Sequence, residues 1–133
     1  MGTLILSTQM TVDGVITVED WFAVEGAHDA ACRALFERSA AMVMGRKTYE
    51  GLAGFWPDQS GPWADLINPM PKFVASRTLA GPLEWNSSLI DGDAVAGVAQ
   101  LKQREGDLAM VGCDAHSRFD SGVTLQRYRP ASS

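Results

Sequence analysis

The sequence predicts an α/β domain built on a mainly parallel β-sheet. Short apolar segments that read as strands alternate along the chain with segments whose apolar residues recur at helical spacing. Strands separated by helices form parallel sheets with right-handed crossovers, so helices cover the sheet. A length of 133 residues suffices for a hydrophobic core, and a single domain is expected over residues 1–133.

The first predicted strand and helix span residues 3–10 and 28–40. The segment TLILSTQM is apolar and β-prone, and the turn-forming sequence VDG follows it. In HDAACRALFERSA, Ala and Leu favour a helix. The positions expected to face inward recur there at three- and four-residue steps, at Cys32, Leu35, Phe36 and Ser39.

A second strand and a second helix are expected over residues 40–45 and from about Thr48. AAMVMG is a short continuous apolar run, as expected for a strand that is covered on both faces. The helix that follows is expected to break down by GFWPD, residues 54–58, where glycine and proline disfavour it.

The rest of the chain supplies further strands and one more helix. PKFVASRTL contains a buried strand, residues 72–76, and EWNSSLIDG, residues 84–92, is a candidate for another. Asp93 is expected to cap a helix that Gly106 ends, and DLAMVG then gives the last strand. The three- and four-residue steps of this helix fall at Val95, Val98, Leu101 and Lys102.

Composition and charge argue against several classes of protein. The formal net charge is -5, whereas a nucleic-acid-binding protein normally has a basic face. A negative net charge also gives no attraction to an anionic membrane. The start of the chain has no basic region of a signal peptide, and no apolar run approaches a membrane span. A cytoplasmic protein with no nucleic-acid or membrane partner is therefore expected. No metal site and no disulfide are expected, given the spacing of Cys32, Cys113, His28 and His116.

Basic and hydroxyl residues follow two neighbouring predicted strands: Gly45-Arg46-Lys47-Thr48 and Ser76-Arg77-Thr78. The carboxyl ends of parallel strands meet at one edge, where ligands bind in such sheets. Glycine lets a ligand approach the backbone, and the free amides and dipole of a helix start attract anions. Two arginines and two hydroxyls can hold a phosphate dianion. Ordinary turns with solvated cations are the competing interpretation.

The motifs, taken in order, resemble those of the dihydrofolate-reductase-like superfamily. They are STQMTVDGVI, Trp21, VMGRKTYEGL, FWP, KFVASRTL and VG, and the resemblance covers about residues 3–113. The similarity is to the branch that contains the reductase domain of bacterial riboflavin biosynthesis, the RibD C-terminal domain. It implies a three-layer α-β-α domain with a largely parallel, twisted sheet, NADPH as cofactor and a homodimer.

The resemblance also implies which residues contact NADPH. By position, the turn that begins at Gly45 would hold the pyrophosphate and the adenosine-ribose phosphate, and Arg46 would act with the second motif on the 2'-phosphate. The implied contacts are Gln9, Val15 and Ile16 on the nicotinamide side, Gly45, Arg46, Lys47, Thr48, Ser76, Arg77 and Thr78 around the phosphates, and Gly112 and Cys113 at the turn after the last strand.

Two carboxylates compete as the catalytic, substrate-side acid, which would orient a polar heterocycle or supply a proton. Asp29 matches the acid in the first helix of dihydrofolate reductases proper. Asp13 matches the acid of the Asp-Gly turn in the riboflavin branch, although Asp-Gly also reads as a plain turn. Trp21 would either wall the substrate pocket or serve in packing.

Residues 114–133 depart from the family pattern. They contain few apolar residues and lack the family's Leu-rich helix and Asp-Glu pair, so its last strands are expected to be missing or replaced. A shifted reading frame near Cys113 is one hypothesis. Permitted codons for residues 113–124, read one nucleotide later, give Ala-Thr-Leu-Thr-Arg-Ala-Leu-Ile-Ala-Gly-Leu, which resembles the missing helix. The coding DNA tests this hypothesis directly.

The expected function is an NADPH-dependent reductase that transfers a hydride to a small heterocyclic or other polar metabolite. In such an enzyme the cofactor carries the chemistry, and the protein supplies binding and orientation. The alternative is a truncated, catalytically silent nucleotide-binding protein of the same fold. A third interpretation is a structural module in which Gly45-Arg46-Lys47-Thr48 merely begins a helix.

Overall fold

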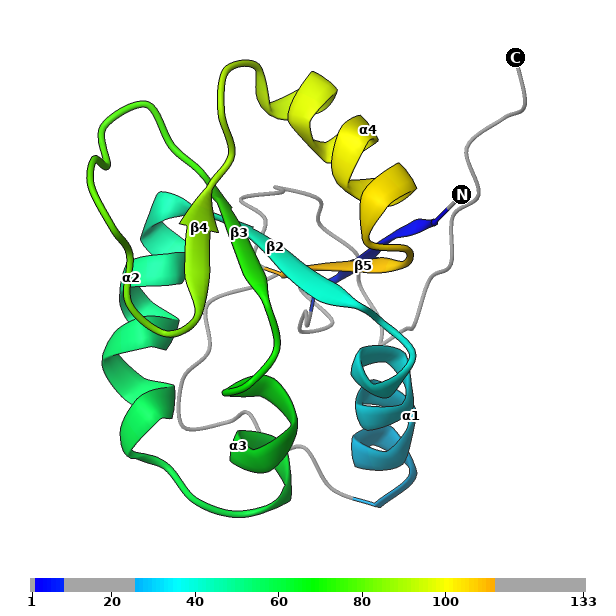
Figure 1. Cartoon of the computed structure of the whole chain (residues 1–133). Helices are drawn as coiled ribbons and strands as arrows, with labels where there is room; N and C mark the ends of the chain where they lie inside the picture. The colour runs from blue at the N-terminus through cyan, green and yellow to red at the C-terminus, as the bar shows by residue number, and fades with distance from the viewer. Residues whose placement is uncertain (1, 9–25, 112–133) are drawn as a thin grey trace, which may run out of the picture. The chain divides into compact units, whose positions relative to one another are not determined.

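The computed structural model describes residues 2–8 and 26–111 (Figure 1). The described strands are β1 Leu4–Ser7, β2 Ala41–Gly45, β3 Lys72–Ala75, β4 Ser87–Leu89 and β5 Leu108–Val111. The helices are α1 Gly26–Glu37, α2 Arg46–Phe55, the 3-10 helix η1 Trp56–Asp58, α3 Pro62–Ile67 and α4 Ala94–Arg104. All of these elements belong to one compact unit. None of the described helices is both long and apolar enough to cross a membrane.

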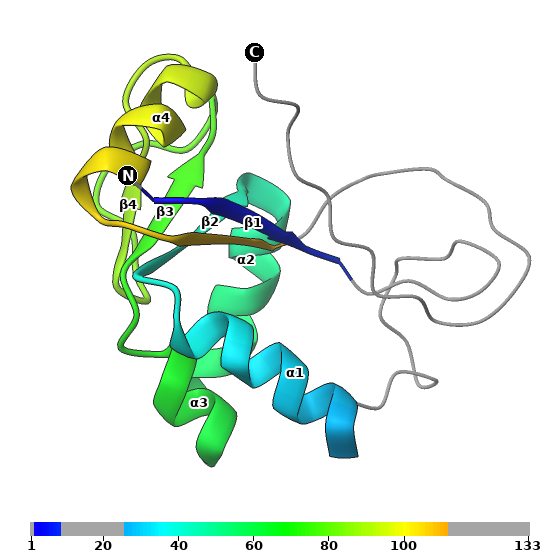
Figure 2. The same cartoon turned by 90° about the vertical axis from the view of Figure 1, so that its right-hand side faces the viewer.

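The five strands form one sheet in the order β1-β5-β2-β3-β4, and every neighbouring pair is parallel. The connections β1–α1–β2 and β2–α2–β3 run in one direction along the sheet, whereas β4–α4–β5 runs back. Right-handed crossovers therefore put α1 and α2 on one face and α4 on the other, as Figure 2 shows. The predicted three-layer α/β fold with a parallel sheet is confirmed.

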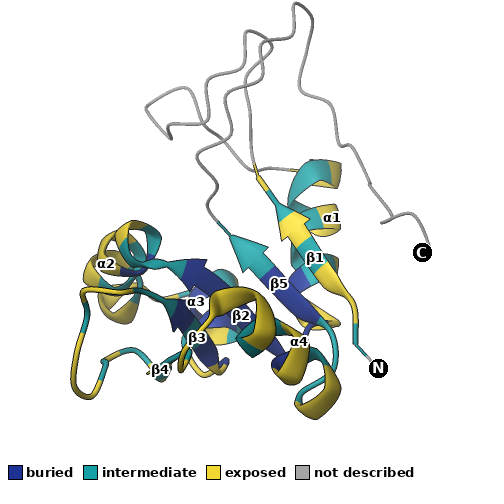
Figure 3. Cartoon of the chain, turned by 90° about the horizontal axis from the view of Figure 1, so that it is seen from above, coloured by how far each residue is buried: buried dark blue, intermediate teal, exposed yellow. Residues whose placement is uncertain are grey.

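Strand β2 lies at the centre of the core and contributes to both faces of the sheet. Met42 and Met44 pack with residues of α1, α2 and α3, which include Phe36, Tyr49 and Ile67. Ala41 and Val43 point the other way and pack with Leu101 of α4 and Leu108 of β5. Figure 3 shows this central burial beside the more exposed edge strand β1. A strand buried on both faces explains the continuous apolar run of residues 41–44.

Several element boundaries differ from those predicted. Helix α2 begins at Arg46, before the expected Thr48, because Gly45 itself adopts the extended N-cap conformation. Helix α3 was not predicted; it starts at Pro62, whose fixed φ suits the first helical position. Strand β4 is shorter than residues 84–92, since Trp85 and Asn86 have φ values of 56° and 49° and form a turn. Val95 is 80% exposed, so the inward face of α4 starts only at Val98.

Gly97 lies where α4 crosses the end of β4, and a side chain there is expected to destabilise the fold. A Cβ at Gly97 would clash with Cγ2 of Ile90, a branched side chain with little freedom to move. Gly97→Ala is therefore expected to lower the free energy of unfolding by about 1 kcal/mol, because overpacking outweighs the gain in helix propensity. Urea denaturation measures this change. In an Ile90→Ala background the cost should disappear; a cost that persists would contradict the proposed clash.

Candidate functional site

The two predicted phosphate-binding segments lie side by side at the carboxyl edge of the sheet. Gly45, the last residue of β2, pairs in register with Ala75, the last residue of β3. Arg46 and Ser76 therefore leave the sheet at neighbouring points. The structure thus brings Gly45-Arg46-Lys47-Thr48 and Ser76-Arg77-Thr78 together at the edge where parallel sheets bind ligands.

The start of α2 offers free backbone donors in an open space. Gly45 is the N-cap residue with φ -85° and ψ 174°, and no side chain among the described residues caps the helix. A Cβ placed on Gly45 would meet no atom of the described residues within 4 Å. The first amides of α2 therefore remain available to an anion, which the helix dipole also favours.

Tyr49 fixes this end of α2 against the loop between β3 and β4. Its side chain is buried, and its hydroxyl accepts a hydrogen bond from the backbone N–H of Glu84 at 3.0 Å. The same hydroxyl donates to the carbonyl oxygen of Glu84 at 3.4 Å. Tyr49, which follows Thr48 in the motif, thus holds the start of α2 in place through Glu84.

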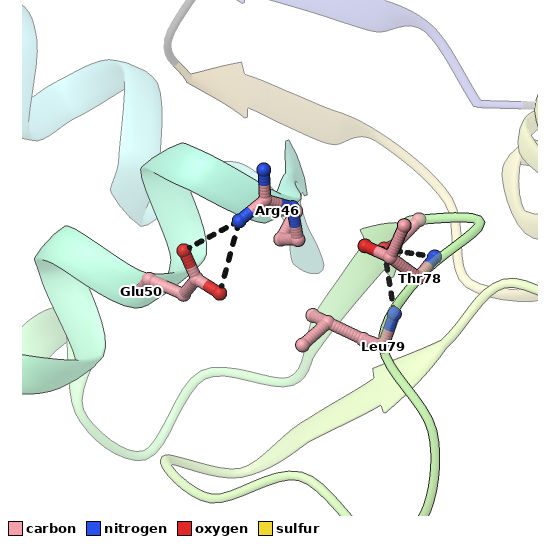
Figure 4. Close-up of polar contacts among 5 residues, drawn as sticks. Arg46, Glu50, Thr78 and Leu79 are labelled. Atoms are coloured by element: carbon pink, nitrogen blue, oxygen red, sulfur yellow. Dashed lines mark hydrogen bonds and ion pairs between the residues drawn. The ribbon is translucent and has the colours of Figure 1, made fainter.

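Ser76 shapes the second segment. Its Oγ accepts hydrogen bonds from the backbone N–H groups of Thr78, at 3.1 Å, and Leu79, at 3.0 Å (Figure 4). An oxygen that accepts two amides still has its own proton to donate. Arg77 and Thr78 are exposed on this turn. The turn therefore presents a guanidinium and hydroxyl donors to the edge of the sheet.

Arg46 is engaged by a carboxylate one helical turn away. Its Nη1 lies 3.0 Å from Oε2 and 3.3 Å from Oε1 of Glu50. The two side chains are 40% and 49% exposed, so the pair is solvated. Within the described part of the chain, Lys47 and Arg77 make no ion pair. The described residues of the site therefore carry more positive than negative charge, although the chain as a whole is acidic.

Asp29 lies in the first turn of α1 and has a partner that the sequence did not reveal. The indole Nε1 of Trp63, on α3, donates to Oδ1 of Asp29 at 2.6 Å. The Trp63 ring also packs edge-on against Phe36, with centroids 5.6 Å apart. The carboxylate is thus fixed between two helices, as a substrate-orienting group would need to be. Its catalytic role remains a prediction.

The remaining predicted site residues lie outside the described residues. They are Gln9, Asp13, Val15, Ile16, Trp21, Gly112 and Cys113. Gly112 and Cys113 directly follow Val111, the last residue of β5. The roles of these residues, including Asp13 as the alternative to Asp29, stay predictions. Within residues 2–8 and 26–111, no group of three or more His, Cys, Asp or Glu side chains could hold a metal ion.

Lys72 was not predicted as a special residue, yet it is the largest fully buried side chain of the described structure. Its Nζ donates to the carbonyl oxygens of Asn68, at 3.0 Å, and Met70, at 2.8 Å. It also lies 4.1 Å from the centroid of the Trp85 ring. Desolvation lowers the pKa of Lys72 from 10.5 to about 8. Because Lys72 begins β3, it stands at the opposite end of that strand from Ser76, away from the two predicted phosphate-binding segments.

The parallel sheet with helices on both faces has the dihydrofolate-reductase-like fold. The RibD C-terminal domain family matches residues 2–125, so the chain belongs to that family. This match continues beyond Cys113, where the motifs recognised in the sequence end.

One solved structure shows the same fold. It is that of a protein from Shewanella sp. PV-4 that is named as a riboflavin biosynthesis protein, with a TM-score of 0.54 and 24% sequence identity. The similarity covers 82% of the present chain and 61% of that protein, so the present chain spans less than two thirds of it. A search of curated proteins gave no match.

Proposed function

We propose that this chain is an NADPH-dependent reductase that transfers a hydride to a small heterocyclic or other polar metabolite. Membership of the RibD C-terminal domain family supports a reductase of the riboflavin-pathway type. The observation that carries the proposal is the pairing of Gly45 with Ala75. This pairing places the uncapped start of α2 beside a turn rich in hydrogen-bond donors. A phosphorylated dinucleotide requires such donors for its phosphate groups.

The described residues fit the phosphate groups of this cofactor. The open space beside Gly45 and the first amides of α2 would hold the pyrophosphate. Arg46, Ser76, Arg77 and Thr78 would hold the 2'-phosphate, and each charged hydrogen bond contributes about 1.5–3 kcal/mol. Bound NADPH would supply the hydride, which leaves the protein to bind and orient both reactants. Asp29, held by Trp63, would orient the substrate or supply a proton, with Asp13 as the alternative.

A comparison of NADPH with NADH tests the proposal. Isothermal titration calorimetry is expected to give a preference for NADPH of more than about tenfold, or ~1.4 kcal/mol. Arg77→Ala should abolish most of this preference and leave NADH binding nearly unchanged, because Arg77 would contact the 2'-phosphate alone. Equal binding of both cofactors, or none, would contradict the proposal.

Turnover separates the reductase from the silent alternative. Oxidation of NADPH in a screen of pyrimidine, pteridine and related heterocyclic substrates would establish the enzyme. Selective NADPH binding without turnover of any substrate would favour a catalytically silent nucleotide-binding protein. The proposal includes a homodimer, which sedimentation velocity of the purified chain tests.

A further inference from the structure

The ion pair between Arg46 and Glu50 lies inside the proposed 2'-phosphate site. Figure 4 shows Arg46 between Glu50, on the next turn of α2, and the turn that contains Thr78 and Leu79. Both carboxylate oxygens of Glu50 approach the same Nη1 of Arg46, at 3.0 and 3.3 Å. The guanidinium that a phosphate would need is therefore already directed toward an anion of the protein itself.

We propose that Glu50 limits the affinity and the 2'-phosphate selectivity of the site by competing with the cofactor for Arg46. This inference rests on the proposed function. A carboxylate and a phosphate bind the same guanidinium donors, so a phosphate that uses the Nη1 facing Glu50 has to share this group or displace Glu50. The negative charge of Glu50 also opposes the approach of a dianion to Arg46.

The expected size of the effect follows from the exposure of the pair. Arg46 and Glu50 are 40% and 49% exposed, and solvated ion pairs of this kind are weak. Removal of the competing charge should therefore tighten NADPH binding by about two- to fivefold. Binding of NADH, which lacks the 2'-phosphate, should change by less than about twofold. Because the competition is electrostatic, the gain should shrink at high ionic strength.

The experiment is calorimetric titration of Glu50→Gln with NADPH, NADH and adenosine 2',5'-bisphosphate. Glutamine keeps the length and helix propensity of glutamate and removes only its charge. Glu37→Gln is the matched control, because Glu37 forms an equivalent pair with Arg33 one turn away on α1, at 3.5 Å. The control removes the same charge from a different helix and should leave NADPH affinity unchanged. In an Arg46→Ala background, Glu50→Gln should give a smaller gain, because only the repulsion between Glu50 and the phosphate then remains.

Each outcome bears on a different statement. Unchanged or weaker NADPH binding by Glu50→Gln, with a selective wild-type chain, would overturn the competition. Weaker binding would instead identify Glu50 as a residue that positions Arg46. An equal gain in NADPH affinity in Glu37→Gln would mean that the effect comes from the net charge of the chain, and it would also overturn the competition for Arg46. A wild-type chain without NADPH selectivity would contradict the proposed function itself, and the role of Glu50 with it.

Discussion

Gly45→Ala is expected to weaken NADPH binding by at least about tenfold while the chain stays folded. The backbone at Gly45 is extended, with φ -85° and ψ 174°, a conformation that any residue adopts. No atom of residues 2–8 or 26–111 lies within 4 Å of a Cβ placed there, so alanine fits among these residues without a clash. The free energy of unfolding should therefore change by less than about 1 kcal/mol. The added methyl group would, however, occupy the space through which a phosphate reaches the first amides of α2.

Gly51→Ala is the matched control for this prediction. Gly51 is an exposed residue of the same helix, and a Cβ there also meets no atom within 4 Å in the part of the chain that the structure describes. Alanine at this position should stabilise the chain by up to about 1 kcal/mol through helix propensity and leave cofactor binding unchanged. Calorimetry and urea denaturation of both variants measure the two effects separately. Wild-type NADPH affinity in Gly45→Ala would show that the phosphates do not approach this stretch of backbone.

The parts of the fold that the sequence predicted are those with a local signature. The apolar run at residues 41–44 marks a strand that is buried on both faces, and the structure confirms it. Asp93 caps α4, since its Oδ2 accepts the backbone N–H of Ala96 at 2.9 Å. The meeting of the segments after β2 and β3 followed from one rule, because parallel neighbouring strands end at the same edge. Polar residues that follow neighbouring parallel strands are therefore expected to lie close together, as the pairing of Gly45 with Ala75 shows.

The features that were not predicted depend on contacts between residues far apart in the chain. Asp29 and Trp63 are separated by 34 positions, and neither carries a local signal for the other. The left-handed turn at Trp85 and Asn86 is stabilised by two further long-range hydrogen bonds. They run from Trp85 Nε1 to Asn68 Oδ1, at 2.8 Å, and from Asn86 Nδ2 to the carbonyl oxygen of Pro69, at 2.7 Å. The β propensity of Trp85 favours a strand there, and these tertiary contacts override it.

Lys72 is the clearest example of such an override, since lysine is almost never fully buried without a partner. Its ammonium is held by the carbonyl groups of Asn68 and Met70, which follow α3, and by the face of Trp85. These groups supply partial negative charge but no carboxylate, so they offset desolvation only in part. The buried lysine therefore links the connection before β3 to the turn before β4. Its burial also disfavours the charged, protonated form of its ammonium group.

This arrangement predicts how stability depends on pH. The pKa of Lys72 is about 8 in the folded chain and 10.5 when desolvation is absent. Between these values the unfolded chain holds a proton that the folded chain has released, so the free energy of unfolding rises with pH. The stability that Lys72 adds at high pH is lost as the pH falls from 10.5 through 8. At about 1.4 kcal/mol per pH unit, the difference between 10.5 and 8 corresponds to about 3 kcal/mol.

Lys72→Met tests this dependence. Methionine has a similar length and no charge, and the carbonyl groups that it leaves without a donor add a cost that does not vary with pH. Urea denaturation of both proteins from pH 7 to 10 measures their free energies of unfolding. As the pH rises, the wild-type value should increase relative to that of the variant by most of about 3 kcal/mol. Lys47→Met, at an exposed lysine, is the matched control. Parallel pH profiles for wild type and Lys72→Met would mean that the carbonyl groups and Trp85 stabilise the ammonium as well as water does.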